Sequence, residues 1–165
     1  MIAIKNILVG TDFGEASGAA LAYGRAFARA FGGTLHVLHV VDDVSTRAAT
    51  AAGFGVDFEQ VQREMEDAAR TDLNALLSDE DRRDLRAKAV VLTSTTPALS
   101  IVQYARDAQV DLIVIGTHGR GAVSHLFLGS VAERVVRMAP CPALTVRHPE
   151  REFVLPDALV AVKAS

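Results

Sequence analysis

Short apolar runs alternate with longer amphipathic segments along most of the chain. The runs are rich in β-branched residues, and three of them, NILV, VVL and LIVI, are nearly continuous hydrophobic stretches. Such runs are typical of parallel strands that are buried on both faces. The alternation predicts an α/β fold, a parallel sheet covered by helices. The predicted strands are residues 3–9, 34–41, 87–93, 110–115 and 143–147.

The first two predicted helices are read from the spacing of their apolar residues. Between the first two strands, apolar residues from Ala16 to Phe31 recur three and four positions apart, and Gly32 and Gly33 end the helix. A second stripe of helical spacing follows the second strand. Its members are Phe58, Val61, Met65, Ala68, Leu73 and Leu76.

Capping residues mark the start of two further helices. Thr96 and Pro97 form an N-cap and first-turn pair, and Ser130 with Glu133 forms a capping box for a helix that runs up to Pro140. Residues 42–57 have no clear period, because tracts of small residues interrupt them, and we predict a mobile connection there.

Length and composition predict one main domain. The chain has 165 residues, half of them apolar, so it is long enough to bury a core. We assign residues 1–148 to this domain and residues 149–165 to a C-terminal extension. The extension contains the apolar run LVAV, which is compatible with either an extra strand or an arm that binds a partner.

The charge distribution argues against nucleic-acid binding, and nothing in the sequence predicts membrane insertion. The 17 basic residues do not gather in a stripe, and those at positions 82–88 stand among four acidic residues at 79–81 and 84, which indicates a solvated helix end. A single cysteine, Cys141, forms no internal disulfide and belongs to no zinc-binding spacing. No apolar run reaches the ~18–20 residues of a spanning helix, and the N-terminus leads straight into a strand. We therefore expect a cytoplasmic protein.

The segment IGTHGRGAVSHLFLGS holds the most informative candidate chemistry. It places Gly116 at the end of a strand, Gly119 three residues later, and Gly129 and Ser130 at the start of a helix. Ligands of open parallel sheets collect at the carboxyl ends of the strands, and a helix N-terminus favours anions. The residues alone leave two interpretations open: an anion-binding loop, or turn glycines followed by an ordinary helix start.

Other phosphate-binding and catalytic motifs do not fit this segment. No lysine follows Gly129, which excludes the Walker A loop, and Ser124 stands where the dinucleotide fingerprint needs glycine. His118 lies inside the loop, but no carboxylate stands at a spacing that would orient it as a general base. We therefore predict no catalytic residue. His36 and His39 are three apart on a strand and face opposite sides, so this pair cannot chelate a metal.

The spacing of these glycines resembles the universal stress protein family. Gly116, two residues, Gly119, nine residues, Gly129 and Ser130 match the G-x2-G-x9-G-[S/T] signature of its ATP-binding branch. The segments ILVGTDFGEAS, LHVLHVVD and APCPALTVR are also similar to that family, and the resemblance covers about residues 1–147. It implies a doubly wound five-stranded parallel sheet of Rossmann-like type, related to the adenine nucleotide alpha hydrolases.

The resemblance also implies a site and a partner. It places Thr11 and Asp12 near the adenosine, and the backbone of Val40 at the adenine edge. The ribose and phosphates would lie among Gly116, His118, Gly119, Arg120, Gly129, Ser130 and Val131. The cofactor implied is ATP, with Mg²⁺ carried by the nucleotide and no metal site of the protein's own. Homodimers would form through the last strand, which starts at Ala143 and ends at Arg147.

Two residues of this implied site invite a second interpretation, and a third residue departs from the family pattern. Asp12 is followed by Glu15 and also reads as an N-cap, and the hydroxyl of Ser130 suits either a cap or a phosphate. Gly10 stands where family members often carry proline, which implies a looser first loop and a pocket that is less preformed.

The function implied is a nucleotide-dependent stress-response or signalling module with a protein partner still to be identified. The alternatives are a slow ATPase of the same fold and a nucleotide-free structural dimer. A phosphoacceptor receiver domain fits poorly, because the first strand offers only Asp12 and the third ends in Thr93 and Ser94. The absence of a lysine and a clear base argues against fast phosphoryl transfer.

Overall fold

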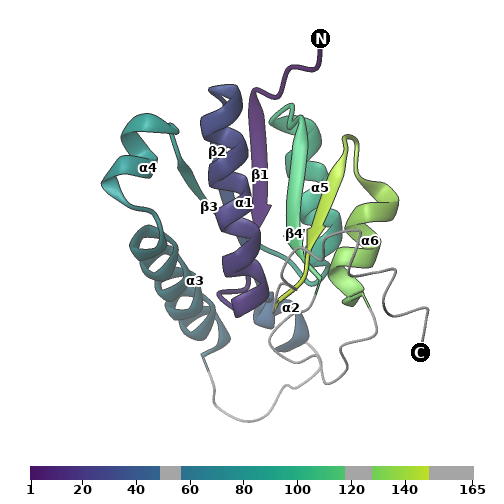
Figure 1. Cartoon of the computed structure of the whole chain (residues 1–165). Coiled ribbons are helices and arrows are strands. Elements are labelled where there is room, and N and C mark those ends of the chain that lie inside the picture. Colours follow the sequence, from purple (N-terminus) through teal and green to yellow (C-terminus); the bar gives the residue numbers. More distant parts are fainter. Residues whose placement is uncertain (49–56, 118–127, 149–165) are drawn as a thin grey trace, which may run out of the picture.

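A five-stranded parallel sheet with helices on both faces forms the centre of the molecule (Figure 1). The computed structural model describes residues 1–48, 57–117 and 128–148, and the extension 149–165 lies outside them. The sheet order is β3-β2-β1-β4-β5. The strands are β1 (Asn6–Gly10), β2 (Thr34–Val41), β3 (Lys88–Thr93), β4 (Leu112–Gly116) and β5 (Ala143–Val146). This confirms the doubly wound α/β fold, with each predicted strand shifted by three residues at most.

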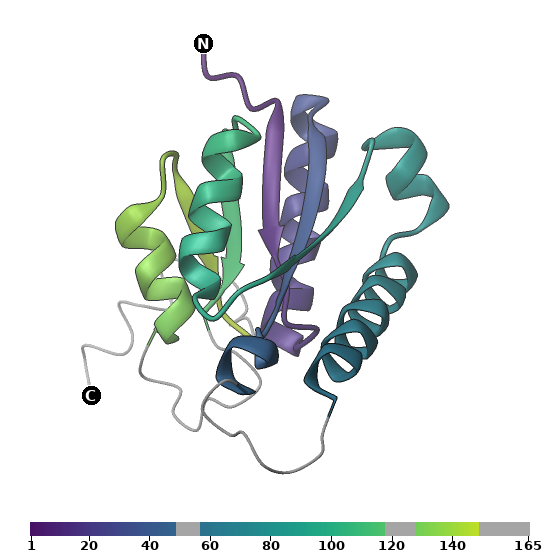
Figure 2. The same cartoon turned by 180° about the vertical axis from the view of Figure 1, so that it is seen from behind.

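Two layers of helices cover the sheet, one on each face (Figure 2). On one face lie α1 (Glu15–Phe31) and α3 (Phe58–Leu76); on the other lie α5 (Pro97–Asp107) and α6 (Ser130–Met138). The short helices are α2 (Val44–Ala48) and α4 (Asp79–Asp84). Ile7 and Val9 of β1 pack toward α1, and Leu8 packs toward α5 and α6. All three are fully buried, as a central strand between two helical layers requires.

Glycines set the length of α1 and its distance from the sheet. Gly32 caps the helix in the left-handed conformation, with φ 62°, and its N–H donates to the carbonyl groups of Ala28 and Arg29. The predicted stop is therefore confirmed. Within the helix, a side chain at Gly24 would collide with Val9, so glycine allows the helix to lie close against β1.

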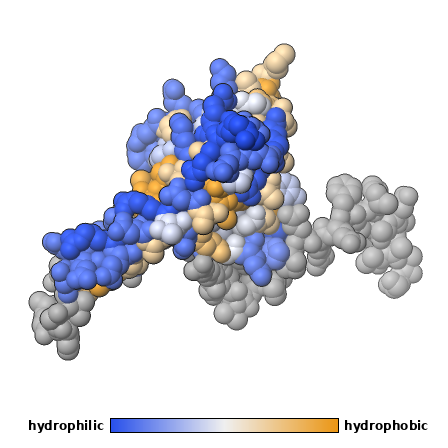
Figure 3. Space-filling model, turned by 90° about the vertical axis from the view of Figure 1, so that its left-hand side faces the viewer, coloured by the Kyte–Doolittle hydropathy of each residue, from blue (hydrophilic) through white to orange (hydrophobic). Residues whose placement is uncertain are grey.

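The apolar stripe predicted for α3 is partly wrong. Val61, Met65 and Ala68 are exposed, whereas Gln62 is buried. Gln62 accepts a hydrogen bond from the backbone N–H of Val44 in α2 and donates one to Glu66, so a polar residue joins the two helices. Figure 3 shows this side of the molecule, where a hydrophobic patch lies between two hydrophilic regions of the surface.

Two connections differ from the sequence expectation. Helix α2 occupies the start of the segment 42–57 that we predicted to be a mobile connection, and residues 49–56 lie outside the described part. The charged run after α3 is a helix of its own rather than a solvated helix end. Its Asp81 is 1% exposed, because Arg25 of α1 binds its carboxylate with an N–O distance of 2.7 Å.

Burial and hydrogen bonding act in opposite directions on Asp81. Burial alone would raise its pKa, but the hydrogen bonds from Arg25 and from the N–H of Ser78 outweigh it and hold the pKa below its usual value. Ser78 and Asp81 also form a capping box at the start of α4. The charged pair therefore joins α4 to α1, with its carboxylate buried.

Candidate functional site

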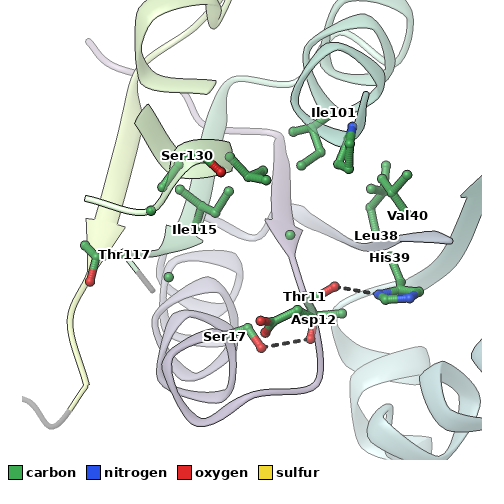
Figure 4. A pocket seen from close by; sticks show the side chains of 16 residues that line it. Thr11, Asp12, Ser17, Leu38, His39, Val40, Ile101, Ile115, Thr117 and Ser130 are labelled. Atoms are coloured by element: carbon green, nitrogen blue, oxygen red, sulfur yellow. Dashed lines mark hydrogen bonds between the residues drawn. The ribbon is translucent and has the colours of Figure 1, made fainter. Parts of the chain in front are cut away.

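A pocket opens at the carboxyl edge of the sheet, between the ends of β1, β2 and β4 (Figure 4). The strand order reverses between β1 and β4, and ligands of open α/β sheets bind at such switch points. The pocket has a volume of about 250 Å³. This is close to the lower end of the range for small-molecule sites, roughly 300–1,000 Å³.

A chain of hydrogen bonds fixes the loop that follows β1. Ser17 donates its hydroxyl proton to the carbonyl of Gly14 at 2.9 Å, so in the 3.1 Å contact between Thr11 and Ser17 it is Thr11 that donates. The Thr11 oxygen in turn accepts from the N–H of Phe13 at 3.0 Å. Asp12 Oδ1 accepts from the N–H of Gly14 at 3.0 Å. The loop therefore has a defined shape, with Asp12 lining the pocket.

This loop corrects one sequence expectation and leaves another as a prediction. Gly10 pairs with Leu38 and Ile115 in the sheet, and its φ is not positive; the looser loop expected from the missing proline stays a prediction. The N-cap of α1 is Gly14 and not Asp12. Asp12 instead stabilises the turn that leads into the helix.

Phe13 stands out because its backbone is left-handed, with φ 62°. This region costs an L-residue with a bulky side chain about 1–2 kcal/mol, so neighbouring contacts must stabilise it. The ring of Phe13 packs on the ring of His39, with centroids 4.6 Å apart. His39 Nδ1 lies 2.8 Å from the carbonyl oxygen of Thr11. Since a carbonyl only accepts, Nδ1 carries the proton.

The backbone of Val40 faces the space beyond the end of β1. Leu38 accepts the N–H of Thr11 on the β1 side of β2, and Val41 accepts the N–H of Ser94 on the β3 side. Because these directions alternate along a strand, the N–H and C=O of Val40 point to the β1 side. There β1 has already ended and the pocket begins. An N–H and a C=O side by side suit a ligand edge that carries one acceptor and one donor.

The opposite wall of the pocket contains the N-terminus of α6. Ser130 is the first residue of the helix, and Gly129 is its N-cap, with no side-chain capping hydrogen bond. The predicted capping box of Ser130 and Glu133 is therefore wrong, and the N–H of Glu133 bonds the carbonyl of Gly129 instead. The first N–H groups of a helix have no partner within it and lie at the positive end of its dipole. Ser130, Val131 and Ala132 line the pocket at this end.

Gly116 lines the pocket, but its lack of a side chain has a packing reason. A Cβ there would lie 2.8 Å from the backbone carbonyl carbon of Ala16 in α1 and 3.0 Å from its oxygen. Atoms in contact normally lie about 3.5–4.0 Å apart. Glycine at this position therefore allows α1 to pack against the end of β4, whether or not a ligand is bound.

Apolar side chains complete the pocket between its two polar ends. Leu38 and Ile115 come from the sheet, and Pro97 and Ile101 come from the first turns of α5. Such a lining suits a flat, largely apolar ring system, with polar groups at its ends to orient it. Among the described residues, no group of three His, Cys, Asp or Glu side chains is placed to hold a metal ion.

The structure brings most of the predicted site residues together. Those that line the pocket are Thr11, Asp12, Val40, Gly116, Gly129, Ser130 and Val131. His118, Gly119 and Arg120 lie outside the described residues. What each residue binds is still a prediction, although their convergence on one pocket favours the anion-site interpretation over separate turn glycines.

Sequence reasoning missed several residues of the site. Ser17 and His39 belong to it, as do Pro97 and Ile101 of α5. The spacing of Pro97 and Ile101, one helical turn apart at the start of a helix, was a usable signal. No sequence pattern pairs His39 with a loop 28 residues away.

The pocket lies at the switch point of a doubly wound parallel sheet, where α/β proteins of this architecture bind their ligands. Residues 3–147 match the universal stress protein family, and the chain belongs to that family. It is 37% identical over 146 residues to a universal stress protein of Thermus aquaticus, a match that covers 87% of this chain and 98% of the relative. In the described residues, no helix is long and apolar enough to cross a membrane.

Solved structures agree with the fold. The structure of protein MJ0577 superposes with a TM-score of 0.74 at 24% identity, covering 91% of this chain and all of that one. A universal stress protein solved in complex with cAMP has a TM-score of 0.54 at 23% identity, covering 88% of this chain and 98% of that one.

Proposed function

We propose that this universal stress protein binds an adenine nucleotide in the pocket at the carboxyl edge of the sheet, and that the nucleotide is ATP with Mg²⁺. The observation that carries the proposal is that the open backbone of Val40 and the first turn of α6 line the same pocket. The cAMP complex of a protein with this fold supports an adenine nucleotide as the ligand.

Each part of the nucleotide has a matching surface. An adenine ring offers an acceptor beside a donor, which the N–H and C=O of Val40 would complement, and its faces would lie against the apolar lining residues Leu38 and Ile101. Phosphates suit the N-terminus of α6, with Gly129 and Ser130 at the start. Asp12 is the carboxylate in the pocket lining that would orient the ribose or water bound to Mg²⁺.

The proposed role is a nucleotide-dependent stress-response or signalling module. Binding without fast turnover is sufficient for such a module, and the glycine signature without a lysine supports it. We also propose that two copies associate through β5. Among the described residues this strand is at one edge of the sheet, so one side of its backbone pairs with no described strand and could pair with a second copy. Sedimentation velocity distinguishes a dimer from a monomer.

Substitutions of Ser130 test the phosphate position. Ser130→Asp adds a negative charge at the first residue of α6, where it favours the helix but repels a phosphate. Ser130→Asn has nearly the same shape and no charge. We expect wild type and Ser130→Asn to bind Mg-ATP within about threefold of one another, and Ser130→Asp to bind at least about tenfold more weakly, a loss of about 1.4 kcal/mol.

Isothermal titration calorimetry with Mg-ATP measures these affinities, and thermal unfolding checks that the three proteins fold equally well. No heat of binding from wild type would refute the proposed function. Equal binding by the Asp and Asn variants would place the phosphates away from α6.

A further inference from the structure

We propose that His39 is a positioning residue of this pocket: its imidazole holds the loop of residues 11–14 in the shape that presents Asp12 to the ligand. The inference rests on the proposed function, because it concerns the pocket assigned there to a nucleotide. His39 belongs to β2 and lines the pocket.

Two contacts connect the His39 ring to the loop, and they reach it from different directions. The Nδ1–H group donates to the carbonyl of Thr11 at 2.8 Å, and the ring face packs on Phe13 with centroids 4.6 Å apart and planes inclined by 43°. Thr11 and Phe13 flank Asp12 in the sequence. The imidazole therefore holds the backbone on both sides of the carboxylate, as Figure 4 shows for the hydrogen bond to Thr11.

The loop needs a stabilising contact because the backbone of Phe13 is left-handed, a conformation that is unfavourable for a bulky residue. A left-handed φ at a bulky residue persists only where its surroundings over-determine it. The internal hydrogen bonds of the loop involve the side chains of Thr11, Asp12 and Ser17. Two hydrogen bonds join this network to the rigid strand β2: the N–H of Thr11 donates to the carbonyl of Leu38, and His39 binds the carbonyl of Thr11. Of these two, His39 is the side chain, and its ring also packs on Phe13.

The hydrogen bond also determines the tautomer of His39. With the proton on Nδ1, neutral His39 keeps a lone pair on Nε2. A ¹H–¹⁵N spectrum that correlates ring nitrogens with ring protons distinguishes the two tautomers. In the neutral imidazole of the ligand-free protein we expect the Nδ1–H form. The Nε2–H form would overturn the proposal.

Two substitutions separate the contacts. His39→Asn places an amide N–H near the position of Nδ1 and removes the ring, whereas His39→Phe keeps the ring and removes the donor. His148 lies outside the pocket, 3.3 Å from Glu15, so His148→Asn is a matched control for the loss of a histidine. Thermal unfolding of all variants reports any general loss of stability.

The readouts are the affinity for Mg-ATP and the hydrogen exchange of the Phe13 and Gly14 amides, whose acceptors lie within the loop. We expect His39→Phe to bind about tenfold more weakly and to exchange these two amides at least about fivefold faster, because the competent loop is less populated. His39→Asn should remain within about threefold of wild type in both, and His148→Asn should be unchanged.

The two readouts distinguish the failure of this inference from the failure of the proposed function. If wild type does not bind Mg-ATP, the proposed function fails, and exchange in the ligand-free protein still decides whether His39 holds the loop. If His39→Phe matches wild type in exchange, or in affinity where wild type binds, the positioning role is overturned. Equal loss in His39→Asn and His39→Phe would also overturn the role assigned to the hydrogen bond.

Discussion

Two glycines at the pocket respond oppositely to the same small substitution. Gly10 and Gly116 end the neighbouring strands β1 and β4, and both line the pocket. A methyl group at Gly10 would meet Ile115 and Ile101 side-chain carbons at 3.6 and 3.7 Å, which are ordinary contacts. A methyl group at Gly116 would lie 2.8 Å from the backbone of Ala16, which belongs to a helix of 17 residues and yields little.

The expected changes in the free energy of unfolding follow from these distances. Overpacking of this kind costs about 1–3 kcal/mol, and we expect Gly116→Ala to lose about 2 kcal/mol because the contacted atoms are backbone. In a domain of this size, that corresponds to a melting temperature about 4–8 °C lower. Gly10→Ala should gain about 0.4–1 kcal/mol, since alanine has less backbone freedom to lose on folding and its side chain fits.

Urea unfolding measures the contrast directly. With a slope of about 2 kcal/mol per molar, Gly116→Ala moves the midpoint down by about 1 M, and Gly10→Ala moves it slightly up. Equal stability of the two variants would refute the reasoning, because it would mean that α1 does not lie against the end of β4. A changed slope would show instead that the unfolded state had been altered.

Two further predictions concern charged groups inside the fold. Asp81→Ala leaves Arg25 without its buried partner and should lower the free energy of unfolding by about 3 kcal/mol, measured in urea. Glu80→Ala removes only an exposed ion pair and should lower it by under about 1 kcal/mol. Equal losses would contradict a structural role for the pair of Arg25 and Asp81. Burial, with a smaller contribution from Lys88, lowers the pKa of His36 to about 4 from 6.5. Between these two pH values the unfolded state therefore binds more protons than the folded state, and the free energy of unfolding falls as pH drops from 6.5 to 4. His36→Asn should flatten this part of the pH profile, and an unchanged profile would contradict the assignment.

The strands could be predicted because they are buried on both faces. Hydrophobic runs such as LIVI need no partner to be recognised, and all five strands have their last residue within one position of the prediction. The first predicted strand began three residues early, at residue 3, because apolar residues continue before Asn6 while the sheet pairing does not.

Elements that depend on distant polar partners could not be predicted in this way. Gln62 is buried because it bonds α2, and Asp81 is buried because Arg25 on α1 reaches it 56 residues away. A hydropathy pattern assigns both to the surface. The same pattern assigns Val61 and Met65 to the core, although both are exposed.

The candidate site was half predictable. The glycine spacing identified the end of β4 and the start of α6, although Gly116 turned out to have a packing reason for its missing side chain. The first loop was harder, because a left-handed Phe13 and a histidine from a neighbouring strand have no local signature. Its shape comes from tertiary contacts, which a single sequence does not display.

The most direct test of the central claim is the map of amide chemical shifts of ¹⁵N-labelled protein titrated with Mg-ATP. We expect the largest changes on pocket residues, above all Asp12, Val40, Ser130 and Val131, and no change in the amides of α3 and α4. A spectrum that does not change, or changes that gather away from the carboxyl edge of the sheet, would contradict it.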